Sequence, residues 1–391
     1  MQRFDQSPTD PDFIQNPYPF YESVRAAGPL AWWDAYDLPV AAGYDAVNAF
    51  FRDRRFGREN PAPPPRPPHQ AAFWAVEDHS MLEADPPRHT RLRAQVARAF
   101  TSRQIQARSF AIRDLAEDLA ARMPDGPFDL LAHVARPFSV RIIATMLGVP
   151  EEEDGQLLAW SKAMVTMYQA GRTVADEERA AKAAGAFSAR LDRIFAARRA
   201  DPQDDLITRL LRISEEGDLS AAEVTATCIL LLNAGHEATI HTLGNGVAGL
   251  LRTGLWGMPV TLSLVEEVLR HDPPLHMFVR HAREDLVVHG QAFKTGDRIG
   301  LLIGGANRDP LRYADPARFD PNRFDGEAPV ALSLGAGIHF CLGAQLARLE
   351  LFEMLRALAE AAPSLTLVEP PTYADIYHFH GLERVMVTKG G

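Results

Sequence analysis

Residues 334–343 read Leu-Gly-Ala-Gly-Ile-His-Phe-Cys-Leu-Gly, and the interpretation of the whole chain starts from them. Three glycines and a cysteine stand at the start of a predicted helix that runs from about Leu342 to Ala361. Glycine permits positive φ and lets the backbone approach a flat ligand closely. A helix N-terminus favours an anion, so it would stabilise a thiolate at Cys341. From the residues alone, this thiolate is either a soft metal ligand or a nucleophile, although no hydrolase elbow surrounds it.

The bulk composition predicts a globular protein of a reducing compartment. The chain has 391 residues, of which 46% are hydrophobic and 24% are charged, so a large core can form. Its two cysteines, Cys228 and Cys341, exclude a disulfide scaffold. The N-terminal residues Met1–Asp5 carry no apolar run, and an apolar run such as Cys228–Leu232 is far too short to span a bilayer. We therefore expect a cytoplasmic protein without a signal peptide or membrane anchor.

The charge of the chain is negative overall but uneven. The formal net charge of −10 disfavours nucleic acid as a partner, because phosphate binding requires a basic face. Residues 86–112 nevertheless contain no acid and six arginines. These are Arg88, Arg91, Arg93, Arg98, Arg103 and Arg108. The segment is either a solvated helix face or a docking patch for an acidic partner.

The periodicity along the chain predicts a mainly α fold with a minor β part. Helical spacing prevails over about 87–270 and 342–361, and the β-richer parts are about 1–60, 275–330 and 366–388. Ser220 and Glu223 form a capping box, and the helix that follows runs without proline to about Leu251. The proline-rich residues 61–68 are either a linker or, as we prefer, an ordered irregular loop.

The segment at Cys341 closely resembles the haem-binding signature of the cytochrome P-450 family, Phe-Gly-x-Gly-x-His-x-Cys-x-Gly. Its one departure is Leu334, where phenylalanine is usual. The resemblance implies haem b with the Cys341 thiolate as proximal iron ligand, and such a ligand favours O–O cleavage. It also implies that Leu334, Gly335, His339 and Gly343 contact the cofactor. The implied fold is a single domain over 1–391, a triangular helix-rich body with small β-sheets.

Two further segments match the family in order and spacing. Glu267-Val-Leu-Arg270 resembles its Glu-x-x-Arg motif, which would pair with Arg323 to lock the region behind the cysteine. A solvated helical pair is the alternative for these residues. Asp85-Pro-Pro-Arg-His89-Thr-Arg-Leu-Arg93 resembles the haem-contacting helix. The residues at the propionate-binding positions of the family are His89, Arg93, Arg280 and His339.

A third match lies in the long helix. Ala234-Gly235-His-Glu237-Ala238-Thr239 resembles the oxygen-binding segment of the family, in which Gly235 leaves room beside the iron for O2 and Ala234 contacts the haem. Glu237 occupies the position of the acid in the proton-delivery pair. The family normally has threonine next, whereas this chain has Ala238 and a displaced hydroxyl at Thr239. One residue turns a helix by about 100°, so Thr239 is not expected to replace the missing alcohol.

The missing alcohol leaves three hypotheses open, because heterolytic O–O cleavage needs two protons delivered in an otherwise dry site. A substrate hydroxyl or an ordered water completes the relay at Ala238, which we favour. Alternatively, the enzyme uncouples and releases peroxide. The third hypothesis is an oxidation that needs less control of protons.

The resemblance also implies the walls of an apolar substrate pocket with few polar anchors. Its expected residues are Phe73, Trp74, Val76, Met164, Met167, Tyr168, Leu231, Ala234, Ala238, Leu275, His276, Met277, Phe278, His378 and Phe379. His276 is the preferred polar anchor. Met164 and Met167 are equally well explained as core residues.

The sequence therefore predicts a haem-thiolate monooxygenase that acts on an apolar small molecule with O2. No flavin or iron–sulfur segment is recognised in this chain, so a ferredoxin and its reductase are expected to supply two electrons. They would dock on the arginine-rich face at Arg88, Arg91, Arg98 and Arg103. A haem-binding protein that does not oxygenate, such as a sensor or a recruitment domain partnered with a larger synthase, is one alternative. A peroxide-driven oxidase is another.

Overall fold

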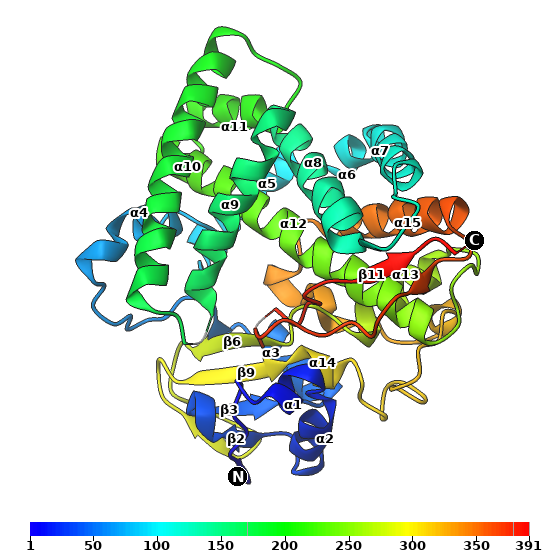
Figure 1. The fold of residues 1–391 in the computed structure, drawn as a ribbon. Coiled ribbons are helices and arrows are strands. Elements are labelled where there is room, and N and C mark those ends of the chain that lie inside the picture. Colours follow the sequence, from blue (N-terminus) through cyan, green and yellow to red (C-terminus); the bar gives the residue numbers. More distant parts are fainter. Residues whose placement is uncertain (170, 378, 391) are drawn as a thin grey trace. The chain divides into compact units, whose positions relative to one another are not determined.

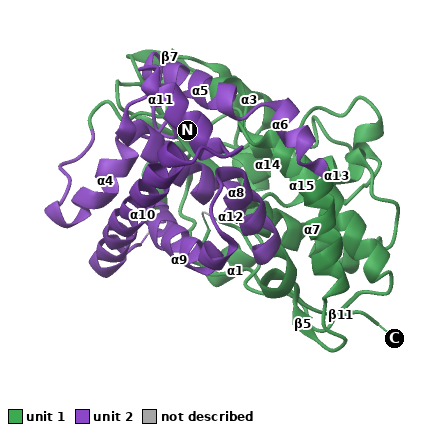
Figure 2. Ribbon diagram, turned by 90° about the horizontal axis from the view of Figure 1, so that it is seen from above, with its two compact units in different colours: residues 1–62, 110–135, 238–391 green, residues 63–109, 136–237 purple. Residues whose placement is uncertain are grey.

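The computed structural model describes residues 1–169, 171–377 and 379–390. The chain divides into two compact units, which Figure 2 distinguishes by colour. Unit 1 comprises residues 1–62, 110–135 and 238–391, and unit 2 comprises residues 63–109 and 136–237. Each unit is assembled from segments far apart in the sequence. The expectation of one family domain over 1–391 stays a prediction.

The main sheet of unit 1 has six strands in the order β1-β2-β3-β9-β6-β4. The strands are β1 (Arg3–Phe4), β2 (Ala31–Trp33), β3 (Leu38–Ala41), β4 (Phe56–Gly57), β6 (Met277–Ala282) and β9 (Arg298–Leu302). Strand β9 pairs parallel with β3 and antiparallel with β6, so it joins the N-terminal part of the chain to the part after residue 275 (Figure 1). The β-richer regions expected at 1–60 and 275–330 therefore form one sheet.

Two smaller sheets complete the β part of unit 1. One contains β10 (Thr366–Leu367), β11 (Met386–Thr388) and β5 (Phe128–Asp129), and the other pairs β7 (Leu286–Val288) with β8 (Gln291–Phe293). Strand β5 lies within a region that the sequence pattern predicted to be helical. Its pairing with β11 joins residues more than 250 positions apart, which local periodicity cannot reveal.

Apolar side chains cover both faces of the main sheet. Ile299 and Leu301 of β9 lie in a cluster with the helix α3, whereas Leu302 lies in a second cluster with Trp33 and Tyr21. Alternate residues of a strand point to opposite faces, which explains this division. The helices of unit 1 are α1 (Pro11–Gln15), α2 (Tyr18–Ala26), α3 (Tyr44–Arg52), nearly all of α7 (Ser109–Ala121), α13 (Leu262–His271), α14 (Ile303–Ala306) and α15 (Ala344–Ala361).

Unit 2 is helical. Its helices are α4 (Ala71–Glu77), α5 (Arg88–Ala99), α6 (Ser102–Ala107), α8 (Arg136–Leu147), α9 (Asp154–Val165), α10 (Val174–Ala200) and α11 (Leu206–Glu215). All of these helices lie within the region 87–270 where the sequence predicted helical spacing, except α4. The proline-rich residues 61–67 form no helix or strand, as expected for an irregular loop.

Helix α12 (Ala221–Arg252) is the predicted long helix, and its first half belongs to unit 2. The backbone N–H of Glu223 donates to Ser220 Oγ at 3.2 Å, and the N–H of Ser220 donates to Glu223 Oε2 at 2.8 Å. These bonds confirm the capping box and fix where the helix begins. In the part of the chain that the structure describes, no helix is both long and apolar enough to cross a membrane.

Candidate active site

The segment before α15 presents the thiol of Cys341 at the start of an 18-residue helix. Gly335 and Gly337 both have φ of +70°, which favours glycine. A Cβ at Gly337 would lie 2.4 Å from the carbonyl oxygen of Phe51, so a larger residue does not fit there. The N–H of Cys341 donates to Leu334 O at 2.9 Å and closes the loop. The glycines thus shape the loop as the sequence predicted.

The two cysteines differ in accessibility. Cys228 is fully buried in α12, and burial raises the pKa of its thiol well above the usual range. Cys341 is partly exposed and stands where the free amide groups of a helix favour an anion. A soft, accessible thiolate suits iron, whereas a buried neutral thiol does not. The donor at Cys341 therefore fits a haem ligand.

Two expected propionate contacts lie in the same unit as Cys341. Arg280 is a residue of β6 and is 2% exposed. Its guanidinium donates to Val279 O at 3.0 Å and lies 5.0 Å from the centre of the Phe51 ring. His339 is half-buried in the short 3-10 helix Gly337–His339, two residues before Cys341. Both cationic residue types suit a carboxylate-bearing cofactor.

The other two expected contacts lie on α5 in unit 2. His89 is 2% exposed and Arg93 is half-buried, and their spacing of four places both on one face of the helix. The arginines Arg91 and Arg98, by contrast, are exposed. Helix α5 therefore separates an inner basic face from an outer one.

The middle of α12 carries the predicted oxygen-binding residues. A Cβ at Gly235 would lie 2.9 Å from Ile143 Cγ1 of α8, so the structure gives this glycine a packing reason. Its part in leaving room for O2 stays a prediction. Glu237 Oε1 lies 3.8 Å from Nε2 of the fully buried His236. Ala234 is exposed, although it stands in the middle of the helix.

The hydroxyls after Ala238 are engaged elsewhere. The Thr239 side chain lies beside the carboxyl of Glu350 on α15, and the Thr242 hydroxyl donates to Ala238 O at 2.7 Å. Glu350 is 1% exposed, and its Oε1 has no hydrogen-bond partner among the described residues. Burial raises the pKa of Glu350 to about 8, so this acid is mostly protonated at neutral pH. Thr239 therefore faces a buried acid that the sequence did not point out.

The predicted pairing of Glu267 with two arginines is present in unit 1. Glu267 Oε2 lies 2.6 Å from Arg270 Nε and 3.2 Å from Arg323 Nε, and both Glu267 and Arg270 are 0% exposed. Arg270 also donates to Asn307 O at 2.9 Å and to Pro316 O at 2.8 Å. Each donor and acceptor of this network has a partner, so the alternative of a solvated helical pair is wrong.

Comparisons with known proteins agree with this geometry. The family described as Cytochrome P450 matches residues 255–360. The chain is 34% identical to the cytochrome P450 monooxygenase PikC of Streptomyces venezuelae, over 92% of this chain and 87% of that protein. It is 36% identical to the vitamin D(3) 25-hydroxylase of Pseudonocardia autotrophica, over 97% of this chain and 95% of that protein. The chain belongs to the cytochrome P-450 family.

A solved member of the family has the same fold. The structure of P450BioI bound to an acyl carrier protein ligated to hexadec-9Z-enoic acid superposes with a TM-score of 0.90. The two sequences are 32% identical, and the match spans 96% of this chain and 99% of the solved chain. This P-450 is accordingly a haem-thiolate monooxygenase with the P-450 fold, and its cofactor is haem b held by a cysteine thiolate.

In unit 2, several expected pocket residues lie close together. The Tyr168 ring is 6.4 Å from the Phe73 ring, and its hydroxyl donates to Glu77 Oε2 at 2.8 Å. Met164 Sδ accepts from Asn233 Nδ2 at 3.8 Å. Phe73, Val76, Met164 and Met167 are buried, whereas Trp74 and Leu231 are half-buried. Their role as pocket walls stays a prediction.

In unit 1, the turn before β6 divides its side chains. Met277 packs in the core cluster with Trp33, and Phe278 packs 6.1 Å from the Phe51 ring on the other side of the sheet. Leu275 and Phe379 form a β-bridge. His378 lies outside the described residues. The turn is thus partly a core element, and its part in binding substrate stays a prediction.

His276, the preferred polar anchor, is fully buried. Its Nδ1 lies 2.8 Å from the Tyr21 hydroxyl, and its Nε2 lies 3.9 Å from Asp272. The side chain is therefore surrounded by polar groups of unit 1, and the anchoring role stays a prediction.

The sequence analysis missed Glu350 and the cluster of Asp272, His276 and His380. One signal for Glu350 was available, since it interrupts the apolar positions Leu346 and Met354 on one face of α15. No local signal joins Asp272 to His380, because 108 residues separate them.

We expect Glu267→Gln to lower the free energy of unfolding by about 3–5 kcal/mol, because it leaves Arg270 buried with less opposing charge. The neighbouring Glu266→Gln is a matched control on the same helix. Glu266 pairs with Arg348, and both side chains are more than a fifth exposed, so its loss is expected to cost about 1 kcal/mol or less. Urea denaturation of the two variants measures the difference. Equal losses would contradict the special role of the buried pair.

We expect Glu350→Gln to change how stability depends on pH. The folded protein holds this proton up to about pH 8, whereas an ordinary glutamate releases it near 4.5. The folded state then binds more protons between these values, so the wild-type protein loses stability as pH rises through this window. Glutamine has no proton to lose. The free energy of unfolding of the variant, measured by urea denaturation, should therefore rise relative to that of the wild type from pH 5 to pH 8.

The control for this prediction is Glu353→Gln, one turn further along α15. Glu353 is ion-paired with Arg113 and Arg356, so its neutralisation should lower stability near neutral pH. A Glu350→Gln variant whose stability follows the wild type in parallel across this range would show that Glu350 is ionised like an ordinary acid.

Proposed function

We propose that this P-450 inserts one atom of O2 into an apolar small organic molecule, with two electrons supplied by a ferredoxin and its reductase. The observation that carries the proposal is the partly exposed Cys341 thiol at the start of α15, in a chain of the P-450 family. When bound, a thiolate-ligated haem supplies the oxygen-activating chemistry. The protein then has to exclude water, orient the substrate and deliver protons.

The apolar character of the substrate is supported by the residues expected to surround it. Phe73, Val76 and Met164 are apolar and buried, and Leu231 and Ala234 leave apolar surface accessible on α12. Two solved relatives hold apolar ligands. One was solved with myristic acid at 32% identity and a TM-score of 0.85, and another with testosterone at 27% identity and a TM-score of 0.84. These ligands belong to those proteins and indicate only the class of substrate.

The electron donor is proposed to dock on the outer face of α5 and α6, through Arg88, Arg91, Arg98 and Arg103. Acids of the same unit already oppose two of these arginines, since Arg91 pairs with Glu223 and Arg98 pairs with Glu216 and Asp218. Among the described residues, no acid forms an ion pair with the exposed Arg103. We therefore assign the largest single contribution to Arg103.

Proton delivery is proposed to use Glu237 together with a substrate hydroxyl or an ordered water at Ala238. Ala238 has no hydroxyl, the Thr239 side chain lies beside Glu350, and the Thr242 hydroxyl donates to the Ala238 carbonyl. Thr242 is therefore not available to hold a water beside Ala238 without breaking a bond, and Thr239 lies beside another acid, Glu350. A hydroxyl from a water or from the substrate could donate the proton without the loss of any hydrogen bond within the protein.

The reaction is tested by screening apolar compounds for a spectral shift of the haem and then measuring product. Product is expected with a ferredoxin, its reductase and NADPH, and much less is expected with hydrogen peroxide alone. Cys341→Ala should remove the carbon monoxide difference spectrum of a thiolate-ligated haem. Product with peroxide alone at an equal rate would favour the peroxide-driven oxidase, and compound binding without product in either system would favour a haem-binding protein.

The same assay tests the docking surface. Its rate at limiting ferredoxin should fall as ionic strength rises, because exposed charges are screened. Arg103→Glu should lower this rate and leave peroxide-driven turnover unchanged. Arg122→Glu, at another exposed arginine directly after α7, is the control and should change neither rate.

We expect Ala238→Thr to leave coupling, measured as product formed per NADPH consumed, unchanged or lower. The added side chain would occupy the place proposed for a water or a substrate hydroxyl. Parallel measurement of hydrogen peroxide gives the uncoupled fraction. A several-fold gain in product per NADPH would show that the missing alcohol is simply a defect, and would overturn this part of the proposal.

A further inference from the structure

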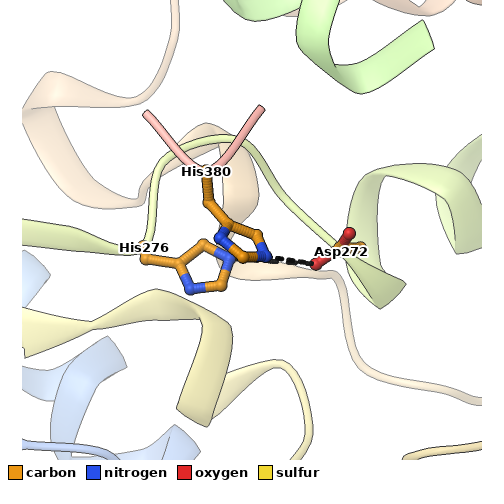
Figure 3. Close-up of side chains that lie close together, drawn as sticks. All are labelled: Asp272, His276 and His380. Carbon is orange, nitrogen blue, oxygen red and sulfur yellow. Dashed lines mark ion pairs between the residues drawn. The ribbon is translucent and has the colours of Figure 1, made fainter. Parts of the chain in front are cut away.

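Three buried side chains of unit 1 converge at a point that the monooxygenase chemistry does not use. Asp272 ends α13, His276 stands in the turn before β6, and His380 comes from the C-terminal segment (Figure 3). Their exposed fractions are 6%, 0% and 1%. His276 Nε2 lies 3.9 Å and His380 Nε2 lies 3.5 Å from Asp272 Oδ1. The three candidate ligand atoms all lie within 4.8 Å of one another.

The hydrogen bonds of His276 leave a lone pair directed at this point. Its Nδ1 contacts the Tyr21 hydroxyl at 2.8 Å, and that hydroxyl donates its own hydrogen to Tyr377 at 2.9 Å. If the Tyr21 hydroxyl accepts the hydrogen of Nδ1, the proton of the neutral ring lies on Nδ1 and Nε2 is an acceptor. In this tautomer a buried acceptor faces the carboxylate of Asp272, and a proton or a metal ion between the two atoms would stabilise the arrangement.

His380 presents a second unsatisfied nitrogen. Neither of its ring nitrogens has a hydrogen-bond partner among the described residues, and the same is true of His276 Nε2. Its ring stacks on Tyr373 with centroids 3.7 Å apart and an angle of 15°, which fixes the plane of the imidazole. Burial lowers the pKa of His380 to about 4, so the ring is neutral near pH 7. Buried polar atoms without partners are rare, and the two Nε2 atoms beside Asp272 Oδ1 require an explanation.

Groups around the ligands hold them in place. The Tyr18 hydroxyl donates to Asp272 Oδ1 at 2.5 Å, and the Tyr373 hydroxyl donates to Oδ2. Asn245 on α12 donates to the backbone carbonyls of both Asp272 and His380, at 3.1 and 2.9 Å. Such contacts orient the ligands of metal sites in proteins. Arg308 adds a positive charge that acts on Asp272, while it donates to His271 O and stacks on the Tyr18 ring. Any added cation must therefore bind through strong ligands.

We propose that Asp272, His276 and His380 form a zinc site that joins the end of α13, the turn before β6 and the C-terminal segment. Two imidazole nitrogens and one carboxylate oxygen are a ligand set typical of Zn²⁺, and a water would complete the tetrahedron. Ligand atoms about 2 Å from a tetrahedral ion lie about 3.3 Å apart, so the observed separations need only small movements. The site is distinct from Cys341 and does not depend on the proposed substrate or electron donor.

The bound ion would act on the C-terminal segment. His380 lies next to Phe379, whose β-bridge partner Leu275 lies next to His276. An ion held by His276 and His380 would therefore hold together the two segments that this β-bridge joins. The expected effect is a higher unfolding temperature and slower proteolysis of the C-terminal segment when zinc is bound.

The proposal is tested on the haem-containing full chain, without an affinity tag and after treatment with a chelator. Titration calorimetry with Zn²⁺ and metal analysis after gel filtration are expected to give one ion per chain. Zinc should also raise the unfolding temperature. Zinc-edge X-ray absorption should report a shell of nitrogen and oxygen ligands that includes imidazole and lacks sulfur, which excludes displacement of iron at Cys341.

Variants locate the ion. Asp272→Asn keeps the shape of the side chain and should weaken zinc binding by about 100-fold or more, as should His380→Ala. His79→Ala, which removes an exposed histidine of unit 2, is the control and should bind zinc like the wild type. Haem content and the unfolding temperature without zinc show whether each variant folds, and His276→Gln replaces any variant that does not.

Two results would overturn the assignment. The first is the absence of stoichiometric zinc binding at micromolar concentrations by wild-type protein with full haem content. The second is unchanged zinc affinity in folded Asp272→Asn and His276→Gln variants, which would place the ion at surface histidines. In either case the cluster would be a buried hydrogen-bonding site that holds a proton or a water.

Discussion

The position of the loop at residues 334–343, which carries Cys341, depends on the ion pairs and hydrogen bonds of the Glu267 carboxylate. It binds Arg270, Arg323 and the backbone N–H of Asp320, the last at 2.7 Å. Arg270 in turn donates to the carbonyl of Asn307. The side chain of Asn307 accepts from the N–H of Leu332 at 2.8 Å and donates to Ser333 Oγ at 2.7 Å.

Leu332 and Ser333 immediately precede residues 334–343. A chain of satisfied polar contacts therefore runs from the interior of α13 to the loop that presents the thiol. The position of a loop depends on the residues that anchor its ends. The buried charges of Glu267 and Arg270 therefore fix this loop, although they take no part in the chemistry. The position of Cys341 is thus determined by charges far from it in sequence, and the glycines give the backbone the conformations that this anchoring demands.

What the sequence could predict follows the range of the interactions involved. The capping box at Ser220 and Glu223 is local, and its prediction is confirmed to the residue. The helix α3 and the start of α12 are likewise set by neighbours within a few positions. The strand β5 was missed because its partner lies more than 250 residues away, and a two-residue strand has no periodicity of its own. The fold class followed from patterns, whereas the pairing of distant strands did not.

The site residues divide in the same way. Cys341 and Glu267 were found because the family signature and the Glu-x-x-Arg spacing lie within short segments. Glu350 and His380 were not, since each acquires its meaning from a tertiary neighbour, Thr239 for the first and Asp272 for the second. A sequence pattern states which residue types are present, but only the fold states which lone pairs face one another.

Buried polar groups in unit 1 can be sorted by whether their hydrogen bonds are complete. Glu267 and Arg270 are fully buried and every group has a partner, as expected for a structural network. Glu350, His276 and His380 are equally buried, yet each retains an atom without a partner among the described residues. An unmet hydrogen bond in the interior costs stability, so its presence in a folded protein suggests that something else binds there.

For Glu350 the proton it retains to about pH 8 is sufficient, because a neutral carboxyl is cheaper to bury than a charged one. The two imidazoles are already neutral and gain nothing from a similar shift, which is why a metal ion explains their lone pairs better than a change of protonation does.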